Sequence, residues 1–213
     1  MNKEESMKVA ILGGSGKAGR FLVKQIFEAG YQMRLLMRNP DKFKLSDERI
    51  EVLKGDARDF PSIKSLLQGC DAVLSTLGQP KGEAPIISIA TGHVLTAMTE
   101  LGIRRYVRIT GASVDAPGDH KDFYTKLPTK LIQWTFPEYW ADWQKELALL
   151  MKSEVEWTLV RLPIIVEQPV ASDVKVNLER LPGKKINGTN LANFLVTQIA
   201  DKQYVRKAPF IAN

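Results

Sequence analysis

The chain has 213 residues, 44% of them hydrophobic, which is enough to bury one substantial core as a single domain. Cys70 is the only cysteine, so an internal disulfide is excluded and a reducing, cytoplasmic setting is expected. The net charge is +6, but the 30 basic residues are spread among 24 acidic ones. This distribution argues against a nucleic-acid partner and favours a basic surface with a pocket for an anionic cofactor.

Residues 1–6 are polar and are expected to form a flexible tail, and no later run is apolar for long enough to span a bilayer. Apolar runs typical of strands then alternate with segments of helical periodicity. The expected strands cover 7–12, 31–37, 50–54, 71–77, 104–110 and 156–162, and the expected helices cover 17–29, 59–68, 84–101 and 138–152. Beyond residue 163 the pattern weakens to a short strand at 174–176, a helix at 189–200 and a late strand at 205–211.

Strands alternating with helices of this length predict an α/β fold, a Rossmann-type doubly wound parallel sheet in one domain. The strand order expected for this class is 3-2-1-4-5-6, with a ligand lying across the carboxyl ends of the strands at the switch point. No spacing of His, Cys and carboxylate residues suggests a metal site.

A glycine-rich turn joins the first expected strand to the first expected helix. It reads Gly13-Gly14-Ser15-Gly16-Lys17-Ala18-Gly19. Glycines at 13, 16 and 19 allow a sharp bend, the approach of backbone N–H groups to a pyrophosphate, and close packing of helix on strand. All seven residues are therefore candidate cofactor contacts, although glycines also mark ordinary turns.

The second expected strand ends at Arg38, where an NAD-preferring protein would carry Asp or Glu to hold the ribose 2′-hydroxyl. Arginine instead offers a planar fork of donors to a 2′-phosphate, and Asn39 is a candidate second contact. The sequence therefore predicts NADP(H) as the cofactor. The alternative is that Arg38 is a solvated surface charge.

Three later strand ends fit the same interpretation. Asp56, after the third strand, can accept a hydrogen bond from the adenine amine, or it can belong to a plain turn before a helix capped by Asp59. The fourth and fifth strands end in small residues that let the backbone pass close to a cofactor. Arg108 on the fifth strand requires a buried carboxylate partner. The candidate cofactor contacts at these ends are Asp56, Ala57, Thr76, Leu77, Gly78, Thr110, Gly111 and Ala112.

These segments together resemble the atypical short-chain dehydrogenase/reductase group, in particular its biliverdin-IX-beta/flavin reductase-like and NmrA-like members. The likeness rests on residues 13–19, 36–40, 55–56, 71–78 and 153–163, and it extends to 164–169. It implies a Rossmann fold, NADP(H), and reduction of a flat conjugated acceptor such as a flavin, quinone or tetrapyrrole. Pro163 and Ile164 join the candidate cofactor contacts.

The sequence departs from the group in its catalytic residues. Typical members use Tyr-x-x-x-Lys to relay a proton, but here Tyr31, Tyr106, Tyr124, Tyr139 and Tyr204 are followed four residues later by Leu35, Thr110, Pro128, Trp143 and Ala208. Where the flavin reductase-like proteins carry a serine and a histidine, this chain carries Gly111 and Trp143, while Asp142 keeps the family's carboxylate. The candidate catalytic residues are Thr110, Asp142 and Trp143, with Asp142 or water as the proton donor.

Aromatic residues are concentrated between 123 and 143. They are Phe123, Tyr124, Trp134, Phe136, Tyr139, Trp140 and Trp143. Two interpretations stay open: a lid that stacks a planar acceptor, or packing of a long loop onto the core or a dimer surface. Segments 111–143 and 164–190 are accordingly expected on the substrate side. We expect an NADP(H)-dependent reductase acting as a monomer or homodimer; the alternative is a non-catalytic NADP(H)-sensing regulator of NmrA-like type.

Overall fold

The computed structural model describes residues 7–168 and 173–213, so the expected tail at 1–6 lies outside the described residues. The strands are β1 (Lys8–Leu12), β2 (Gln32–Met37), β3 (Ile50–Lys54), β4 (Ala72–Ser75), β5 (Arg105–Gly111), β6 (Glu156–Leu162), β7 (Ile164–Val166), β8 (Lys175–Asn177), β9 (Lys185–Asn187) and β10 (Phe210–Ala212). The helices are α1 (Lys17–Glu28), α2 (Phe60–Leu67), α3 (Ile87–Leu101), α4 (Phe123–Thr135), α5 (Pro137–Lys152) and α6 (Gly188–Ala200), with a short 3-10 helix at Pro40–Lys42.

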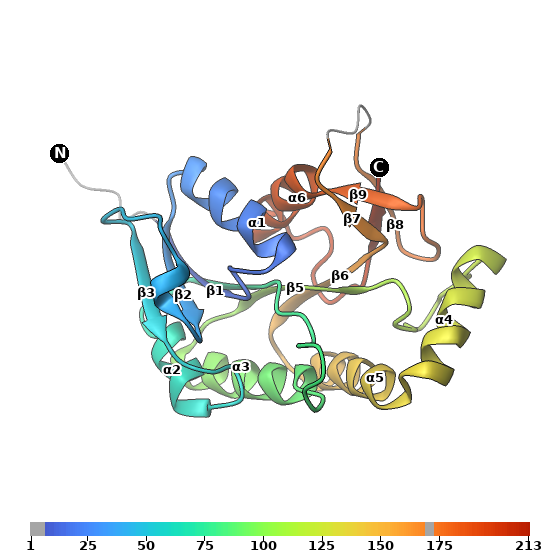
Figure 1. The fold of residues 1–213 in the computed structure, drawn as a ribbon, viewed down its shortest axis with the longest axis horizontal. Coiled ribbons are helices and arrows are strands. Elements are labelled where there is room, and N and C mark those ends of the chain that lie inside the picture. Colours follow the sequence, from blue (N-terminus) through green and yellow to red (C-terminus); the bar gives the residue numbers. More distant parts are fainter. Residues whose placement is uncertain (1–6, 169–172) are drawn as a thin grey trace.

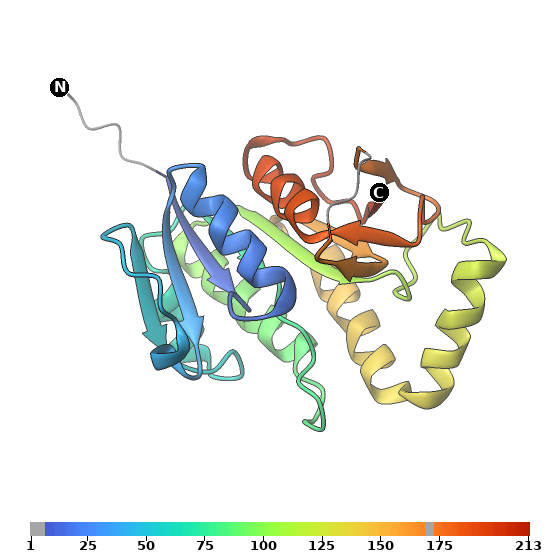
Figure 2. The same cartoon turned by 45° about the horizontal axis from the view of Figure 1, so that its top comes forward.

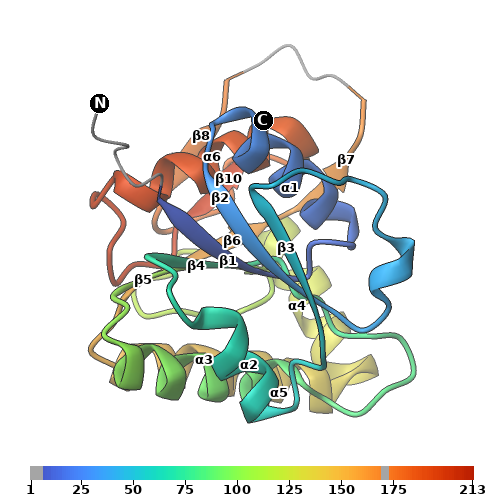
Figure 3. The ribbon, with the colours of Figure 1, turned by 90° about the vertical axis from the view of Figure 1, so that its left-hand side faces the viewer.

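The main sheet has the order β3-β2-β1-β4-β5-β6-β10-β8, which confirms the expected Rossmann-type order and extends it by two strands. All neighbouring strands from β3 to β10 pair in parallel, and only β8 at the edge is antiparallel. Helices α1 and α6 cover one face, and α2, α3 and α5 cover the other (Figures 1 and 3). Strands β7 and β9 form a separate parallel pair.

Both faces of the sheet are buried, because successive side chains of a strand point to opposite sides. On β1, Val9 and Ile11 pack in a cluster with residues of α1 and α6, whereas Ala10 and Leu12 pack in a cluster with residues of α2, α3 and α5. The apolar runs of the sequence are therefore explained by two cores, one on each side of a single sheet.

Two expected elements differ from the structure at their boundaries. The late strand expected at 205–211 is only the short strand β10, because Arg206 has a φ of 58° and cannot continue an extended strand. The helix expected from residue 84 begins at Ile87, and residues 79–86 form a loop between β4 and α3. This loop contributes to the candidate site described below.

Helix α4 was not expected from the sequence. The side chain of Asp122 caps it by accepting a hydrogen bond from the backbone N–H of Thr125 at 2.8 Å. Pro128 lies inside the helix and supplies no N–H to the preceding turn, which conceals the helical pattern in the sequence. The segment expected to be a loop or lid is thus a helix followed directly by α5, and α4 projects at one end of the molecule (Figure 2).

None of the helices in the described ranges combines the length and apolarity that crossing a membrane requires.

Candidate active site

Three adjoining hollows follow the carboxyl ends of the parallel strands. The first, here called the glycine-loop cleft, has a volume of about 290 Å³ and lies between the turn after β1, the end of β2 and the loops after β3 and β4. The second, the central cleft, measures about 230 Å³ and lies at the ends of β4, β5 and β6. The third, the outer cavity, measures about 690 Å³ and is bounded by α4, Trp143 and residues 181–184.

Shared lining residues show that the three hollows adjoin one another in a row. The glycine-loop and central clefts share Thr76, Leu77, Gly78 and Gln79. The central cleft and the outer cavity share Gly111, Trp143, Leu162 and Pro163. A long ligand can therefore lie across the strand ends from the β2 side toward α4, as in other open parallel sheets.

The turn after β1 depends on glycine at two positions. Gly13 has a φ of +78°, and a Cβ there would meet the backbone N of Leu77 at 2.6 Å. A Cβ at Gly19 would come within 2.1 Å of the carbonyl oxygen of Gly13. Because glycine has no Cβ at these two positions, the turn can pack closely against Leu77 and α1, which is the local reason for the glycine spacing.

Gly16 has a different function in this turn. It lines the glycine-loop cleft beside Gly13 and Ser15, and a Cβ there would meet only the Gly13 carbonyl oxygen at 3.3 Å. Its missing side chain therefore keeps the cleft open at the amino end of α1, where backbone N–H groups and the helix dipole favour an anion.

The other residues of the predicted phosphate turn lie behind this surface. Gly14, Ala18 and Gly19 are buried under the turn. The amino group of Lys17 donates a hydrogen bond to the carbonyl of Ile165 at 2.8 Å and ties the turn to β7. Among the seven predicted contacts, Gly13, Ser15 and Gly16 are the ones that face the cleft.

The rim of the glycine-loop cleft carries a cluster of charged side chains. Arg38 at the end of β2 and Arg58 after β3 each donate to Glu83, at 2.8 Å and 3.0 Å respectively. Arg58 also pairs with Asp56 through two hydrogen bonds of 2.9 Å and 2.6 Å, and this guanidinium lowers the pKa of the Asp56 carboxyl. Asn39, the predicted second contact, is not among the residues that line this cleft.

The end of β4 lies between the first two hollows. The hydroxyl of Thr76 donates to the carbonyl oxygen of Gly13 at 3.1 Å, so the predicted contacts Thr76, Leu77 and Gly78 are fixed against the glycine turn. All three residues line both clefts, and their contact with a cofactor stays a prediction. Ala57 lines the glycine-loop cleft beside Asp56.

The central cleft contains the predicted residues of β5 and β6. Thr110, Gly111 and Pro163 line it, and Ala112 and Ile164 lie farther along in the wall of the outer cavity. Arg108 borders the cleft and pairs with the fully buried Glu146 of α5 at 2.8 Å. The expected carboxylate partner of Arg108 is thereby identified.

Asp142 occupies a different position from the one the sequence suggested. Its carboxylate accepts hydrogen bonds from the backbone N–H groups of Ile87 at 2.9 Å and Ser88 at 3.3 Å, so it caps the amino end of α3. It is not among the residues that line the central cleft or the outer cavity. This geometry gives Asp142 a capping function, and its expected part in catalysis stays a prediction.

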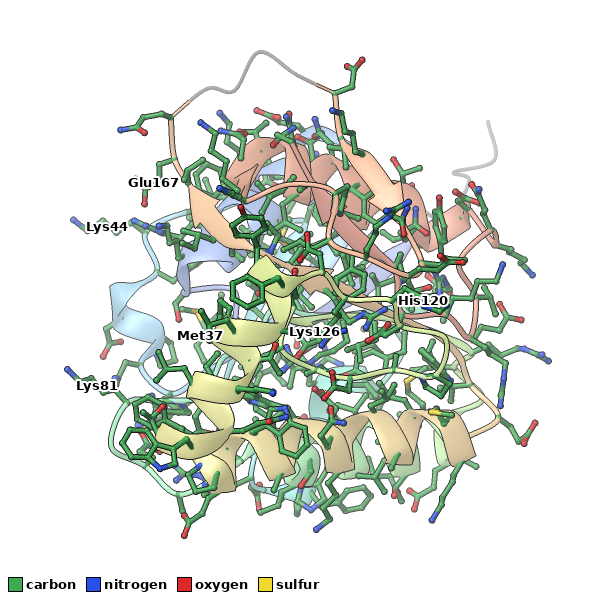
Figure 4. All side chains as sticks on the ribbon, turned by 90° about the vertical axis from the view of Figure 1, so that its right-hand side faces the viewer. Met37, Lys44, Lys81, His120, Lys126 and Glu167 are labelled. Atoms are coloured by element: carbon green, nitrogen blue, oxygen red, sulfur yellow. The ribbon has the colours of Figure 1, made fainter. Side chains whose placement is uncertain are left out.

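Residues of α4 line one side of the outer cavity. Figure 4 shows α4, which carries Lys126, at the front of the molecule. Thr125, Pro128, Thr129 and Ile132 of α4 line the cavity. Lys184 also lines it, with its ammonium 5.2 Å from the ring centroid of Tyr124. The wall is mostly apolar, as is typical of sites for small organic ligands.

The aromatic segment 123–143 is divided among several places. Trp143 and Tyr124 line the outer cavity, whereas Trp134 is 81% exposed at the end of α4. Phe136 and Tyr139 stack on each other at a centroid distance of 5.9 Å in a separate cleft of about 430 Å³, which Glu83 also lines. Of the seven aromatic side chains, only Tyr124 and Trp143 line the outer cavity, and a lid that stacks an acceptor stays a prediction.

Several residues at the site were not expected from the sequence. Arg58, Gln79, Glu83 and Lys184 all take part in the walls or the rim. Arg58 alone carried a local signal, since it lies two residues after Asp56. Across the described residues, no group of three or more His, Cys, Asp and Glu side chains is placed to hold a metal ion.

A glycine turn between the first strand and helix of a parallel sheet, with clefts at the strand ends beside it, defines a Rossmann-type dinucleotide-binding protein. The chain belongs to the NAD(P)H-binding family, whose model matches residues 13–202.

Among curated proteins, the chain is similar to cinnamoyl-CoA reductase 1 of Petunia hybrida, with 29% identity over 119 residues, covering 50% of this chain and 36% of that protein. It is also similar to the (4-alkanoyl-5-oxo-2,5-dihydrofuran-3-yl)methyl phosphate reductase of Streptomyces griseus, with 26% identity over 118 residues, covering 55% of this chain and 39% of that protein. The matched stretches thus span well under half of these relatives. They confirm the resemblance to the atypical short-chain dehydrogenase/reductase group, and the narrower likeness to flavin reductases stays a prediction.

Solved structures confirm the fold. A short-chain dehydrogenase/reductase of Veillonella parvula in complex with NADP superposes with a TM-score of 0.78 at 15% identity, covering 97% of this chain and 94% of that one. A Rossmann-fold NAD(P)-binding family protein of Shigella flexneri gives a TM-score of 0.75 at 17% identity, covering 97% and 93% of the two chains.

Proposed function

We propose that this protein is an NADP(H)-dependent reductase that transfers a hydride to a flat conjugated acceptor, such as a flavin, a quinone or a tetrapyrrole. One observation carries the proposal: the central cleft adjoins the mostly apolar outer cavity. The two share the lining residues Gly111, Trp143, Leu162 and Pro163. A flat acceptor lying against Trp143 would be stacked directly beside whatever occupies the central cleft.

The cofactor is assigned along the first two hollows. The adenosine end belongs in the glycine-loop cleft, with Asp56 toward the adenine, Arg38 toward a 2′-phosphate and Gly16 beside the pyrophosphate. The nicotinamide end belongs in the central cleft, against Thr110 and the backbone of residues 76–78. When bound there, the reduced nicotinamide supplies the hydride.

The lack of an evident proton-donating side chain favours acceptors that can be reduced without a protein acid. Tyr-x-x-x-Lys is absent from the sequence, and the Asp142 carboxylate is engaged at the amino end of α3. A flavin or quinone that accepts a hydride needs one proton to complete its reduction, and water can supply it. Trp143 and the inner face of α4 would then bind and orient the acceptor without themselves transferring a proton.

The proposal extends to the cellular compartment, the oligomeric state and the type of substrate. Cys70 is free and buried, which fits a reducing compartment such as the cytoplasm, and we expect a monomer or homodimer that acts on a small planar substrate.

The test is steady-state oxidation of NADPH by the purified protein with FMN, a soluble quinone or biliverdin as acceptor, followed by the loss of reduced-nicotinamide absorbance. We expect turnover with at least one of these acceptors and a lower rate with NADH. If the protein binds NADPH tightly and none of the three acceptors is reduced, the reductase assignment is wrong and an NADP(H)-sensing regulator replaces it.

A further inference from the structure

Glu83 bridges two arginines that line the glycine-loop cleft. One of its carboxylate oxygens accepts a hydrogen bond from Arg38 at 2.8 Å, and the other accepts one from Arg58 at 3.0 Å. Arg38 directly follows β2 and Arg58 follows β3, whereas Glu83 lies on the loop after β4. The carboxylate therefore links that loop to two residues that line the cleft. Both arginine side chains are about half exposed, and Glu83 is 30% exposed.

The loop that carries Glu83 is held in place by contacts that do not involve its carboxylate. The side-chain amide of Gln79 donates to the carbonyl oxygens of Glu83 at 2.9 Å and Ala84 at 3.0 Å, and its oxygen accepts from the N–H of Ile86 at 3.1 Å. The hydroxyl of Tyr139 donates to the Glu83 carbonyl at 3.1 Å. The Glu83 side chain can therefore leave the arginines while the backbone of the loop keeps its position.

The two arginines also differ in how many of their guanidinium N–H donors are available to another anion. Asp56 takes the Nε and Nη2 donors of Arg58, so the Nη1 group that faces Glu83 is the part left for another anion. Arg38 likewise donates to Glu83 through Nη1. An acidic group between two guanidinium groups is the arrangement that a phosphate oxygen cluster would take in this position, since arginine binds carboxylates and phosphates through the same donors.

We propose that Glu83 determines cofactor specificity by occupying the place of the 2′-phosphate. NADP(H) displaces the carboxylate from Arg38 and Arg58, and NAD(H), which has no 2′-phosphate, leaves it there. The inference rests on the proposed NADP(H) site and deepens it. It adds Arg58 as a second phosphate-binding arginine and predicts that the protein binds NADP(H) less tightly than the two arginines alone would allow.

Glu83→Gln tests the exchange because it removes the charge and keeps the size of the side chain. The probes are 2′,5′-ADP, which carries the 2′-phosphate, and 5′-AMP, which does not, each measured by isothermal titration calorimetry. Losing a charge-assisted competitor should tighten 2′,5′-ADP binding by about five- to tenfold. Binding of 5′-AMP should change little.

Glu138→Gln is the matched control. Glu138 is exposed and lines the same separate cleft as Glu83, and Glu138→Gln removes the same charge. Thermal melting of both variants checks that each is folded. If Glu138→Gln tightens 2′,5′-ADP as much as Glu83→Gln does, the effect is general electrostatics and the proposal is overturned.

The outcomes separate this inference from the proposed function. If the wild-type protein prefers 2′,5′-ADP to 5′-AMP but Glu83→Gln binds it equally or more weakly, Glu83 supports the arginines rather than competing for them, and only the inference fails. If neither protein distinguishes the two probes, the NADP(H) assignment fails together with it.

Discussion

In the proposed function, the choice between NADP(H) and NAD(H) depends on Arg38. Arg38→Glu should weaken NADPH binding by about tenfold, the lower end of the range for a charge-assisted hydrogen bond, because the side chain is 55% exposed and already shared with Glu83. NADH binding should change less, so the preference should narrow or reverse. The measurement is the dissociation constant of each cofactor by fluorescence titration.

Lys24→Glu provides the control for this charge reversal, since Lys24 is exposed on α1 and pairs only with Glu28 among the ion pairs of the described residues. Equal dissociation constants for NADPH and NADH in the wild-type protein would contradict the assignment of Arg38.

Gly16 tests the phosphate turn. Gly16→Val places a branched side chain in the glycine-loop cleft, where the Cβ meets only one atom of the protein at 3.3 Å, so the fold should survive while NADPH binding is lost. Circular dichroism and cofactor titration measure the two effects separately. Gly92→Ala is the control, because a Cβ at Gly92 on α3 has no neighbour within 4 Å and should leave binding unchanged. Normal NADPH binding by Gly16→Val would mean that residues 13–19 form only a turn.

Residues fixed by local geometry could be predicted from the sequence, and residues joined across the sheet could not. Gly13 and Gly19 are required by contacts within one turn and between adjacent strands, so their spacing carries the signal. Glu83 lies 45 residues from Arg38 and 25 from Arg58, and nothing in the intervening sequence indicates that the three meet. A long separation in sequence also concealed the contact between Asp142 and the start of α3. Asp142 lies 55 residues after Ile87 and 54 after Ser88.

At the scale of elements, Asp142 connects α5 to the amino end of α3. Asp142→Ala should destabilise the protein by about 1–3 kcal/mol, because two buried backbone N–H groups lose their acceptor. Asp142→Asn should cost less, since its amide oxygen can still accept one of the bonds. Urea unfolding gives the free energies, and kcat for both variants is measured with any acceptor that the wild type reduces.

The two functions of Asp142 give opposite patterns. A cap lowers the free energy of unfolding and leaves kcat nearly unchanged, whereas a general acid lowers kcat by about a hundredfold or more in Asp142→Asn. The second pattern, without a change in stability, would restore Asp142 as the proton donor.

The elements that the sequence predicted well are strands with a continuous apolar run and helices with no proline beyond the first turn. Helix α2 also begins as expected, with the Asp59 side chain accepting from the N–H of Ser62 at 2.9 Å. Helix α4 lacks these signals. Pro128 interrupts it, and its exposed side includes Phe123, Leu127, Leu131 and Trp134, so apolar residues do not mark its buried face. Its position over the outer cavity therefore had to come from the structure.

At the scale of the whole molecule, Trp143 lies where the central cleft meets the outer cavity. Trp143→Ala should raise the KM for a flavin or quinone several-fold, since a stacked aromatic pair contributes about 0.5–1.5 kcal/mol beyond burial. The Kd for NADPH should change much less. Trp134→Ala is the matched control, because Trp134 is exposed at the end of α4 and does not line the cavity. Equal effects of the two substitutions on KM would contradict a stacking function for Trp143.

The wall shared by the central cleft and the outer cavity also bears on the order in which ligands bind. A nicotinamide in the central cleft would complete one side of the outer cavity, so the surface that an acceptor contacts is unfinished until the cofactor is in place. Catalysis would then follow a compulsory order, with the cofactor first to bind and last to leave. Oxidised cofactor should compete with NADPH, and excess acceptor should slow turnover by trapping the oxidised complex before the cofactor can leave.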